Sequence, residues 1–319
     1  MNTPLCEITT YESLPCKHFS YELATNAITK LLSFKDRKPK GLLITGPSGV
    51  GKTYIAEQTT LSLQIPTTES LSPKAVIYLD ASLYSSVGDA LSQILLELGD
   101  PTPYQGTIGN KENRACKLLH SLRVKLLIID EVQDFLPKKG TTPNSKVYKF
   151  LKSFLNKCKV PFLLLGTENS ETLFADDQLR TRFLPTQFIP AFTCYGDVSM
   201  SNFALLIEAM TEKLPRKCKG LKFCDEVTLE NGEAAYVLKK EHRLLLRLCL
   251  ATKGLMRLTS DLLTECIVLT KPHETVDIVV LEQAFNNVIN SELPYNPFDT
   301  SIKITKIKNK LIEDNLYVK

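Results

Sequence analysis

The sequence lacks the cysteine and histidine patterns that hold a structural zinc ion. Its nine cysteines include no CxxC pair, and it contains only four histidines. Zinc sites are built from cysteine and histidine ligands at short, regular spacings. We therefore expect no zinc site, and we expect the cysteines to be buried or idle thiols in a reducing cytosol.

Long apolar runs are also missing. No stretch approaches the ~20 apolar residues that a membrane-crossing helix needs. The segment MNTPLCEITTYESLPCKHF does not join a charged region to an apolar one, as a signal peptide does. We expect a cytoplasmic protein with no membrane partner.

The composition is that of a folded globular chain. Its 319 residues suit one large domain or two modest ones, and 43% of them are hydrophobic. The net charge of +4 is only mildly basic. It permits a nucleic-acid partner without requiring one, so the distribution of charge matters more than the total.

Apolar runs and helical patterns alternate through the first half of the chain. Strands are predicted at 41–46, 75–80, 125–130 and 161–166, and helices at 20–34, 51–63, 87–98, 111–123 and 145–158. The Gly- and Pro-rich segment 99–110 is predicted to be a loop. This alternation predicts an α/β fold with a parallel sheet covered by helices on both faces.

The strand signals mostly stop near residue 200. Helices are predicted at 201–214, 233–252, 256–270 and 279–291, with a hairpin in the interruption at 216–232. The expected domains are an N-terminal extension and helix (1–35), an α/β nucleotide-binding domain (36–198), an α-helical lid domain (199–292) and a C-terminal tail (293–319). The tail SIKITKIKNKLIEDNLYVK has no obvious place in either core.

The segment GPSGVGKT fits the phosphate-loop pattern G-x-x-x-x-G-K-[ST], between a predicted strand and a predicted helix. In this pattern backbone N–H groups surround the phosphates, the lysine reaches the β- and γ-phosphates, and the hydroxyl contacts Mg²⁺. The expected nucleotide-binding residues here are Gly46, Pro47, Ser48, Gly49, Val50, Gly51, Lys52, Thr53 and the adjoining Tyr54.

Two carboxylates follow the buried run LLII. Asp130 ends a predicted strand beside the phosphate-loop strand, where a carboxylate can hold the Mg²⁺ shell together with Thr53. Glu131 points differently and can orient and deprotonate an attacking water. The simpler alternative is that Glu131 only ends a strand. Water activation fits hydrolysis better than transfer to a small acceptor.

Further polar residues lie beyond this doublet. Thr167 follows the next predicted strand and can contact the γ-phosphate or the water. Arg180 and Arg182 lie in DDQLRTRF, where an arginine can serve a neighbouring subunit's nucleotide or merely pair with a nearby aspartate. Arg257, early in a helix after Gly254, is suited to reach the nucleotide.

In order and spacing these segments resemble the AAA+ ATPases over most of residues 20–292. Within that superfamily the peptides GPSGVGKT, LGDPTPYQGT, LLIIDEVQDF, LLLGTENSETL, QLRTRF and GLMRLTSDLL are similar to the TniB/TnsC family, the ATP-dependent regulators of bacterial transposons. The resemblance implies Walker A at 46–53, Walker B at 126–131, sensor 1 near Thr167, an arginine finger at Arg182 and sensor 2 at Arg257. It also implies ATP and Mg²⁺ as cofactors.

The same resemblance implies partners. ATP would bind between subunits and assemble a ring or helical homo-oligomer, hexamer- or heptamer-like, on double-stranded DNA. That assembly would link a TniQ-type target-selection protein to transposase subunits. The insert at 137–159, the segment 216–232 and the tail after residue 293 do not match the family pattern.

Two surfaces are candidates for DNA. Seven lysines between residues 138 and 159, without a carboxylate, would attract phosphates or an acidic partner, although any single one is more simply a solvated side chain. The family resemblance favours the loops at 82–88 and 104–109. Its candidate DNA-binding residues are Ser85, Ser86, Gln105, Thr107, Lys111 and Arg114. Thr107 is equally explained as a helix N-cap.

Three other functions remain open. A helicase loader or replication initiator would share every ATP residue and differ only in partners. A P-loop kinase acting on a small molecule is disfavoured by Glu131, Arg182 and the helical lid. A nucleotide-gated scaffold without hydrolysis is disfavoured only modestly by Glu131.

Overall fold

The structure is a computed structural model that describes residues 4–13, 18–35, 38–64, 74–136, 145–228 and 234–317. These residues form two units. The α/β unit is Ser20–Ile189, and the C-terminal unit combines Met1–Phe19 with Pro190–Lys319. Among the described residues, no helix is both long and apolar enough for a bilayer span.

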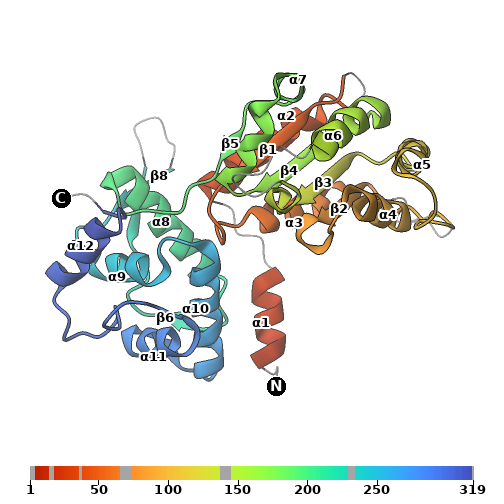
Figure 1. The fold of residues 1–319 in the computed structure, drawn as a ribbon. Coiled ribbons are helices and arrows are strands. Elements are labelled where there is room, and N and C mark those ends of the chain that lie inside the picture. The colour runs from red at the N-terminus through yellow and green to blue at the C-terminus, as the bar shows by residue number, and fades with distance from the viewer. Residues whose placement is uncertain are drawn as a thin grey trace. The chain divides into compact units, whose positions relative to one another are not determined.

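The α/β unit is built on a five-stranded sheet in the order β2-β3-β4-β1-β5 (Figure 1), and every pairing in it is parallel. Its strands are β1 (Gly41–Thr45), β2 (Val76–Asp80), β3 (Leu126–Asp130), β4 (Phe162–Gly166) and β5 (Gln187–Phe188). Its helices are α2 (Phe19–Leu32), α3 (Lys52–Leu63), α4 (Val87–Glu97), α5 (Ile108–Ser121), α6 (Ser145–Cys158) and α7 (Asp177–Arg180). Short 3-10 helices follow three strands, namely η1 (Ala81–Leu83), η2 (Val132–Phe135) and η3 (Glu168–Ala175).

Both faces of this sheet are buried, as predicted for a parallel sheet. Side chains alternate between faces along a strand. Leu43, Ile129 and Leu164 pack in one cluster with buried residues of α4, α5 and α6. Their neighbours Leu42 and Ile128 point the opposite way and are also buried. The predicted α/β class is therefore confirmed.

The register brings the carboxyl ends of three strands to one edge. Thr45 lies opposite Gly166 and Ile129 lies opposite Leu164, so the residues that follow β1, β3 and β4 are neighbours. Ligands of open α/β sheets bind at this kind of edge. The fold therefore gathers Gly46, Glu131 and Thr167, which are far apart in the sequence.

The C-terminal unit is mainly helical, with short strands. Its helices are α1 (Pro4–Ser13), α8 (Gly196–Thr211), α9 (Arg243–Thr252), α10 (Met256–Leu269), α11 (Ile278–Val288) and α12 (Ile304–Glu313). Its strands are β6 (Lys217–Cys218), β7 (Cys224–Thr228), β8 (Ala234–Leu238) and β9 (Thr275–Val276).

Two predictions for this unit are corrected. The expected helix at 233–252 is wrong in its first part, because Ala234–Leu238 is strand β8 and α9 begins only at Arg243. A short apolar run such as AAYVL fits a helix or a strand by pattern alone. The hairpin exists, but it joins β7 to β8, whereas β6 pairs with β9 in parallel.

The tail that had no predicted place is part of this unit. Ile307 and Leu311 of α12 are buried, and α12 packs against α9. Buried Arg247 of α9 donates to the carbonyls of Asp299 (2.9 Å) and Ile302 (2.7 Å), and so fixes the segment that leads into α12. A charged side chain that caps several carbonyls holds a loop firmly in a buried setting.

Candidate nucleotide site

The phosphate loop connects β1 to α3. Gly49 (φ 84°) and Gly51 (φ 97°) have left-handed backbone conformations that most residues adopt only at a cost. A side chain at Gly46 would meet the carbonyl oxygen of Ile189 at 2.2 Å, so only glycine fits there. Gly51 precedes α3 and gives it no side-chain cap. The first N–H groups of α3 therefore have no side-chain acceptor at this cap, which is the usual arrangement for phosphate binding.

Lys52 is buried under this loop, with 6% of its surface exposed. Its Nζ donates to the carbonyls of Gly46 (2.9 Å) and Pro47 (2.8 Å). Burial lowers the pKa of the Lys52 ammonium, and the Glu131 and Asp130 carboxylates oppose that shift. The predicted phosphate-binding lysine thus lies beside the predicted carboxylates.

Asp130 is the centre of a hydrogen-bonded group at the end of β3. It is 1% exposed, and its Oδ2 accepts from Thr53 Oγ1 (2.7 Å) and from Tyr78 Oη (3.0 Å). Its Oδ1 accepts from the N–H of Glu131 at 2.8 Å. The structure therefore brings together Thr53 and Asp130, the two residues predicted to hold Mg²⁺.

Glu131 has a left-handed backbone conformation with φ 49°, unusual for a non-glycine residue. One of its carboxylate oxygens accepts from Gln133 Nε2. Gln133 Oε1 accepts in turn from the backbone N–H of Thr167 at 3.0 Å. Glu131 and Thr167, predicted separately, are thereby joined through a third side chain.

Tyr78 and Gln133 are site residues that the sequence interpretation missed. Tyr78 lies in the apolar run AVIYLD and looked like an ordinary strand residue. Burial, and then the nearby Asp130 carboxylate, raise the pKa of the Tyr78 phenol, so it remains a hydrogen-bond donor. For Gln133, the one signal in the sequence was a polar side chain two residues after Glu131.

The set of oxygen donors fits MgATP. Thr53 and Asp130 offer a hydroxyl and a carboxylate, which are ligands suited to Mg²⁺. The hydroxyl of Thr167 is buried and has no hydrogen-bond partner among the described residues. A buried hydroxyl without a partner is costly and is commonly satisfied by a ligand or a water.

Among the described residues of the α/β unit, Arg180 and Arg182 make no hydrogen bond to this group. Arg182 is partly buried, and its guanidinium donates to the carbonyl of Gln178 and to Asn156 Oδ1 (3.3 Å). In the part of the chain that the structure describes, no ion pair involves Arg182. Arg180 forms one, with its Nη1 3.9 Å from Asp177 Oδ1. Arg257 is exposed on α10 of the C-terminal unit. Tyr54 of α3 has its ring centroid 6.2 Å from that of Tyr21.

The loops predicted to meet DNA lie together, at the amino ends of α4 and α5. A side chain at Gly88 would come within 3.7 Å of Ile108, which shows that the two loops adjoin. Ser85 and Ser86 both donate to Asp89 Oδ2, at 2.8 and 2.7 Å. Their hydroxyls therefore already have acceptors within the α4 cap.

Three of the remaining predicted DNA contacts are also bonded within the unit. Thr107 caps α5 by accepting from the N–H of Asn110 at 3.3 Å. Lys111 donates to Ser92 Oγ at 2.7 Å. Arg114 donates to the carbonyls of Thr102 and Gln105. Gln105 is exposed, and its side chain makes no hydrogen bond to another described residue.

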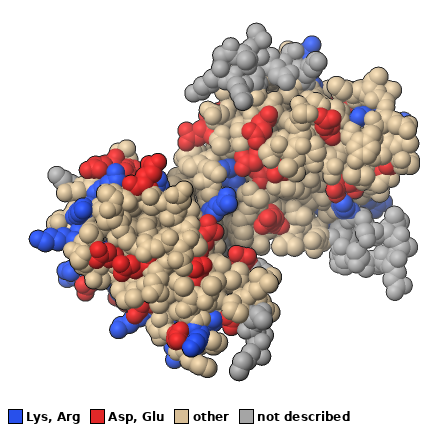
Figure 2. Space-filling view, turned by 60° about the horizontal axis from the view of Figure 1, so that its bottom comes forward, with Lys and Arg blue, Asp and Glu red and all other residues tan. Residues whose placement is uncertain are grey.

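Of the four lysines between residues 138 and 159 whose side chains the structure describes, two are paired with carboxylates. Lys152 pairs with Asp176 (2.9 Å) and Lys157 pairs with Glu112 (3.4 Å). Lys149 is exposed, and the side chains of Lys138, Lys139 and Lys146 lie outside the described set. On the face shown in Figure 2, acidic and basic side chains of the described residues are interspersed.

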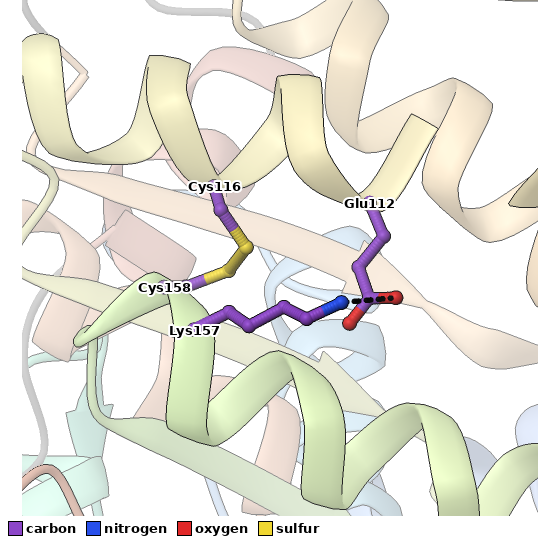
Figure 3. Close-up of a disulfide and its surroundings, with 4 residues drawn as sticks. All are labelled: Glu112, Cys116, Lys157 and Cys158. Atoms are coloured by element: carbon purple, nitrogen blue, oxygen red, sulfur yellow. Dashed lines mark ion pairs between the residues drawn. A yellow bond between two sulfur atoms is a disulfide. The ribbon is translucent and has the colours of Figure 1, made fainter. Parts of the chain in front are cut away.

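A disulfide joins α5 to α6 beside the ion pair of Glu112 and Lys157 (Figure 3). It links Cys116 to Cys158, which are 42 residues apart in the sequence. The expectation of idle thiols is wrong for these two cysteines, because helix packing brings them together without any sequence motif. The other cysteines of the described residues are free thiols.

Comparison with known proteins agrees with this geometry. A family model described as "Bacterial TniB protein" matches residues 17–191, and no curated protein matches the chain. Among solved structures, the ORC2 protein of Aeropyrum pernix, in ADPNP–ADP complexes, has a TM-score of 0.59 at 15% identity, covering 86% of this chain and 70% of that one. The ORC1 protein of Aeropyrum pernix in complex with DNA has a TM-score of 0.56 at 18% identity, covering 85% and 65%.

Cdc6p from Pyrobaculum aerophilum has a TM-score of 0.55 at 12% identity, covering 87% of this chain and 69% of that one. At such low identity these likenesses show a shared fold, and this chain spans only about two thirds of the length of the ORC1 and Cdc6p chains. The family match covers more than half of the 319 residues. The chain therefore belongs to the TniB family and has the fold of the AAA+ ATPases.

Proposed function

We propose that this protein is an ATP-dependent, DNA-binding AAA+ ATPase that regulates DNA transposition. Its oligomer would assemble on double-stranded DNA and link a target-selection protein of the TniQ type to the transposase. The single observation that carries the ATPase is the bonded group in which Thr53, Asp130 and Glu131 meet beside buried Lys52. Membership of the TniB family supports the transposition role.

Each residue of the group has a distinct part in this proposal. The α3 N–H groups and Lys52 hold the phosphates, and Thr53 and Asp130 hold Mg²⁺, which neutralises phosphate charge when bound. Glu131 takes the proton of the attacking water. Its carboxylate lies next to this group, and the Thr53 hydroxyl donates to Asp130 and not to Glu131. The hydroxyl of Thr167, which has no hydrogen-bond partner among the described residues, contacts the γ-phosphate or the attacking water.

Arg182 is proposed to act on the nucleotide of a neighbouring subunit. It is partly exposed, and its guanidinium has no carboxylate partner among the described residues, so its charge remains free to serve another subunit. Such an arginine contributes about 10³–10⁵-fold to the rate. Mixing Arg182→Ala protein with Lys52→Ala protein should restore part of the ATPase activity that neither has alone. No recovery in the mixture would contradict action between subunits.

The proposed domain roles follow the fold. The α/β unit would bind the nucleotide, and the helical C-terminal unit would act as the lid, with Arg257 coupling the nucleotide state to lid position. Double-stranded DNA would be the ligand of the assembled ring or filament. The ORC1 likeness is to a protein whose structure was solved in complex with DNA.

Electron microscopy of the purified protein with duplex DNA tests the proposal. Wild-type and Glu131→Gln proteins would be compared in ATP, a slowly hydrolysed analogue and ADP. Rings or filaments that need both duplex and triphosphate, and that persist in ATP only for Glu131→Gln, are the expected result. A monomer indifferent to DNA in every nucleotide state would overturn the DNA-assembly role.

A replication initiator or helicase loader is the second candidate, favoured by the likeness to ORC and Cdc6p structures. It predicts the same assemblies on duplex DNA. The two functions separate when purified transposase is added, because only a transposition regulator should retain it on the assembled protein. A helicase retained in its place would favour the second candidate.

A further inference from the structure

Gln133 bridges two positions of the candidate site. Its Oε1 accepts from the backbone N–H of Thr167 at 3.0 Å, and its Nε2 donates to a carboxylate oxygen of Glu131. A backbone N–H can only donate, so the amide oxygen must face Thr167 and the amide NH₂ must face Glu131. The direction of this bridge is therefore fixed by chemistry.

The bridge continues to the phosphate loop through one peptide group. The carbonyl of Gly166 accepts from the N–H of Gly46 at 3.2 Å. That carbonyl and the N–H of Thr167 belong to the same planar trans peptide, and they point to opposite sides of it. One rigid plane thus connects the first residue of the phosphate loop with Gln133, and Gln133 with Glu131.

The local packing leaves room for this connection. A side chain at Gly166 would lie 2.2 Å from Ser170 Oγ and 2.7 Å from Gln133 Oε1. Any other residue there would displace the amide of Gln133. Glycine at this position therefore leaves room for Ser170 and for the bridging amide of Gln133.

Glu131 needs such an anchor. Its left-handed backbone, with φ 49°, is a strained conformation that persists only where its surroundings hold it. Without Gln133, its carboxylate would have no side-chain partner among the hydrogen bonds of the described residues. Gln133 occupies one carboxylate oxygen and leaves the other available to a water.

We propose that Gln133 is a positioning residue for the hydrolysis reaction. It holds the Glu131 carboxylate at a fixed place relative to the phosphate loop, through the Gly166–Thr167 peptide. This inference rests on the proposed ATPase activity of the same site. It also makes Gln133 a route by which a shift of Gly46 on nucleotide binding reaches Glu131.

The test is a double-mutant cycle in steady-state ATPase assays with duplex DNA. Gln133→Leu keeps much of the side-chain volume and removes both hydrogen bonds. We expect its kcat to fall about 10–100-fold, because a hydrogen bond to a charged group is lost, while KM for ATP changes less than about 3-fold. In the Glu131→Gln background the same change should lower the residual rate less than about 2-fold, because Gln133 acts through Glu131.

Two further variants keep the test independent of folding. Asp134→Asn alters an exposed side chain of the same turn and should leave kcat and the melting temperature unchanged. Gln133→Glu keeps an acceptor for Thr167 but places a carboxylate against Glu131. It should lower kcat at least as much as Gln133→Leu, whereas a purely structural role for Gln133 predicts that it recovers activity.

The outcomes separate this inference from the proposed function. An active wild-type protein whose Gln133→Leu variant keeps its kcat would overturn the positioning role alone. Equal losses in the wild-type and Glu131→Gln backgrounds would overturn it too, because Gln133 would then act independently of Glu131. A wild-type protein that binds ATP with duplex DNA and never hydrolyses it would overturn both.

Discussion

Two polar regions of the α/β unit differ in how far along the chain their side chains find partners. At the carboxyl edge of the sheet, Thr53 bonds to Asp130 across 77 residues, and Gln133 bonds to Thr167 across 34. Each of these bonds joins elements that only the folded sheet brings together. Together they hold a group of polar atoms around the phosphate loop.

The loops before α4 and α5 behave differently. Ser86 Oγ accepts from the N–H of Asp89, and Thr107 Oγ1 accepts from the N–H of Asn110, in each case three residues away. These are ordinary helix caps, which satisfy N–H groups that the first turn of a helix leaves unpaired. Polar residues of the same types form the candidate site at the sheet edge, whereas in these loops they stabilise the loops themselves.

This difference changes how polar residues in the two regions should respond to substitution. A residue whose partners come from distant strands holds the reacting groups in place, so its substitution should lower activity more than stability. A residue that caps its own helix or ties its own loop should do the reverse. Matched variants of the two regions test this division.

Glu131→Gln should give the largest effect. General-base catalysis contributes about 10²–10⁴-fold, so kcat should fall by that factor. ATP affinity should remain within a few-fold, because Lys52 and Thr53 are untouched, and the melting temperature should be unchanged. Hydrolysis and equilibrium nucleotide binding, measured on the same preparation, check this. Undiminished hydrolysis would remove Glu131 from the reaction.

Arg114→Ala should show the opposite pattern, with a loss of stability. Arg114 Nε lies 3.0 Å from Asp100 Oδ2, whose side chain is only 6% exposed, and the guanidinium also binds two loop carbonyls. Leaving Asp100 without its cation should cost about 1–3 kcal/mol. Urea denaturation measures this, with exposed Lys117→Ala on the same helix as the control.

DNA binding by the folded Arg114→Ala variant decides what the residue does. If duplex affinity at a temperature well below unfolding stays near that of Lys117→Ala, Arg114 supports the loop only. A much weaker affinity in a variant of unchanged stability would show that Arg114 contacts DNA directly. The loop residues would then not be limited to stabilising their own loops.

The residues of the candidate nucleotide site could be placed from the sequence more readily than the side-chain contacts of the candidate DNA loops, for a physical reason. The phosphate loop and Asp130-Glu131 are contiguous segments whose chemistry is local, so strand pattern and motif suffice to place them. Tyr78 and Gln133 joined the site through pairings of β2 with β3 and of β3 with β4, which no local pattern encodes.

The errors have the same origin. The apolar run of β8 fits either helix or strand, and only its pairing with β7 decides between them. Cys116 and Cys158 meet because α5 packs on α6, which their spacing does not indicate. Lys152 and Lys157 looked like free charges because Asp176 and Glu112 are remote in sequence. Long-range contacts decided each of these cases.

Thr107→Ala should have a moderate effect on stability. Loss of an N-cap hydroxyl typically costs about 1 kcal/mol, and Thr107→Ser should keep most of it because serine caps equally well. The measurement is the free energy of unfolding of both variants. If Thr107→Ala is as stable as wild type but binds duplex more weakly, its hydroxyl serves DNA and not α5.

The smallest effects are expected on α6, where they discriminate between lysines of the same helix. Lys152 is paired with Asp176, both partly exposed, so Lys152→Ala should cost less than about 1 kcal/mol of stability. Lys149 is exposed and has no ion pair in the described chain. If this face contacts the duplex, Lys149→Ala should reduce the slope of log affinity against log salt by about 1, the amount expected for one phosphate contact, whereas Lys152→Ala should reduce it less. If neither slope changes, α6 lies away from DNA, and the exposed Gln105 loop becomes the surface to mutate next.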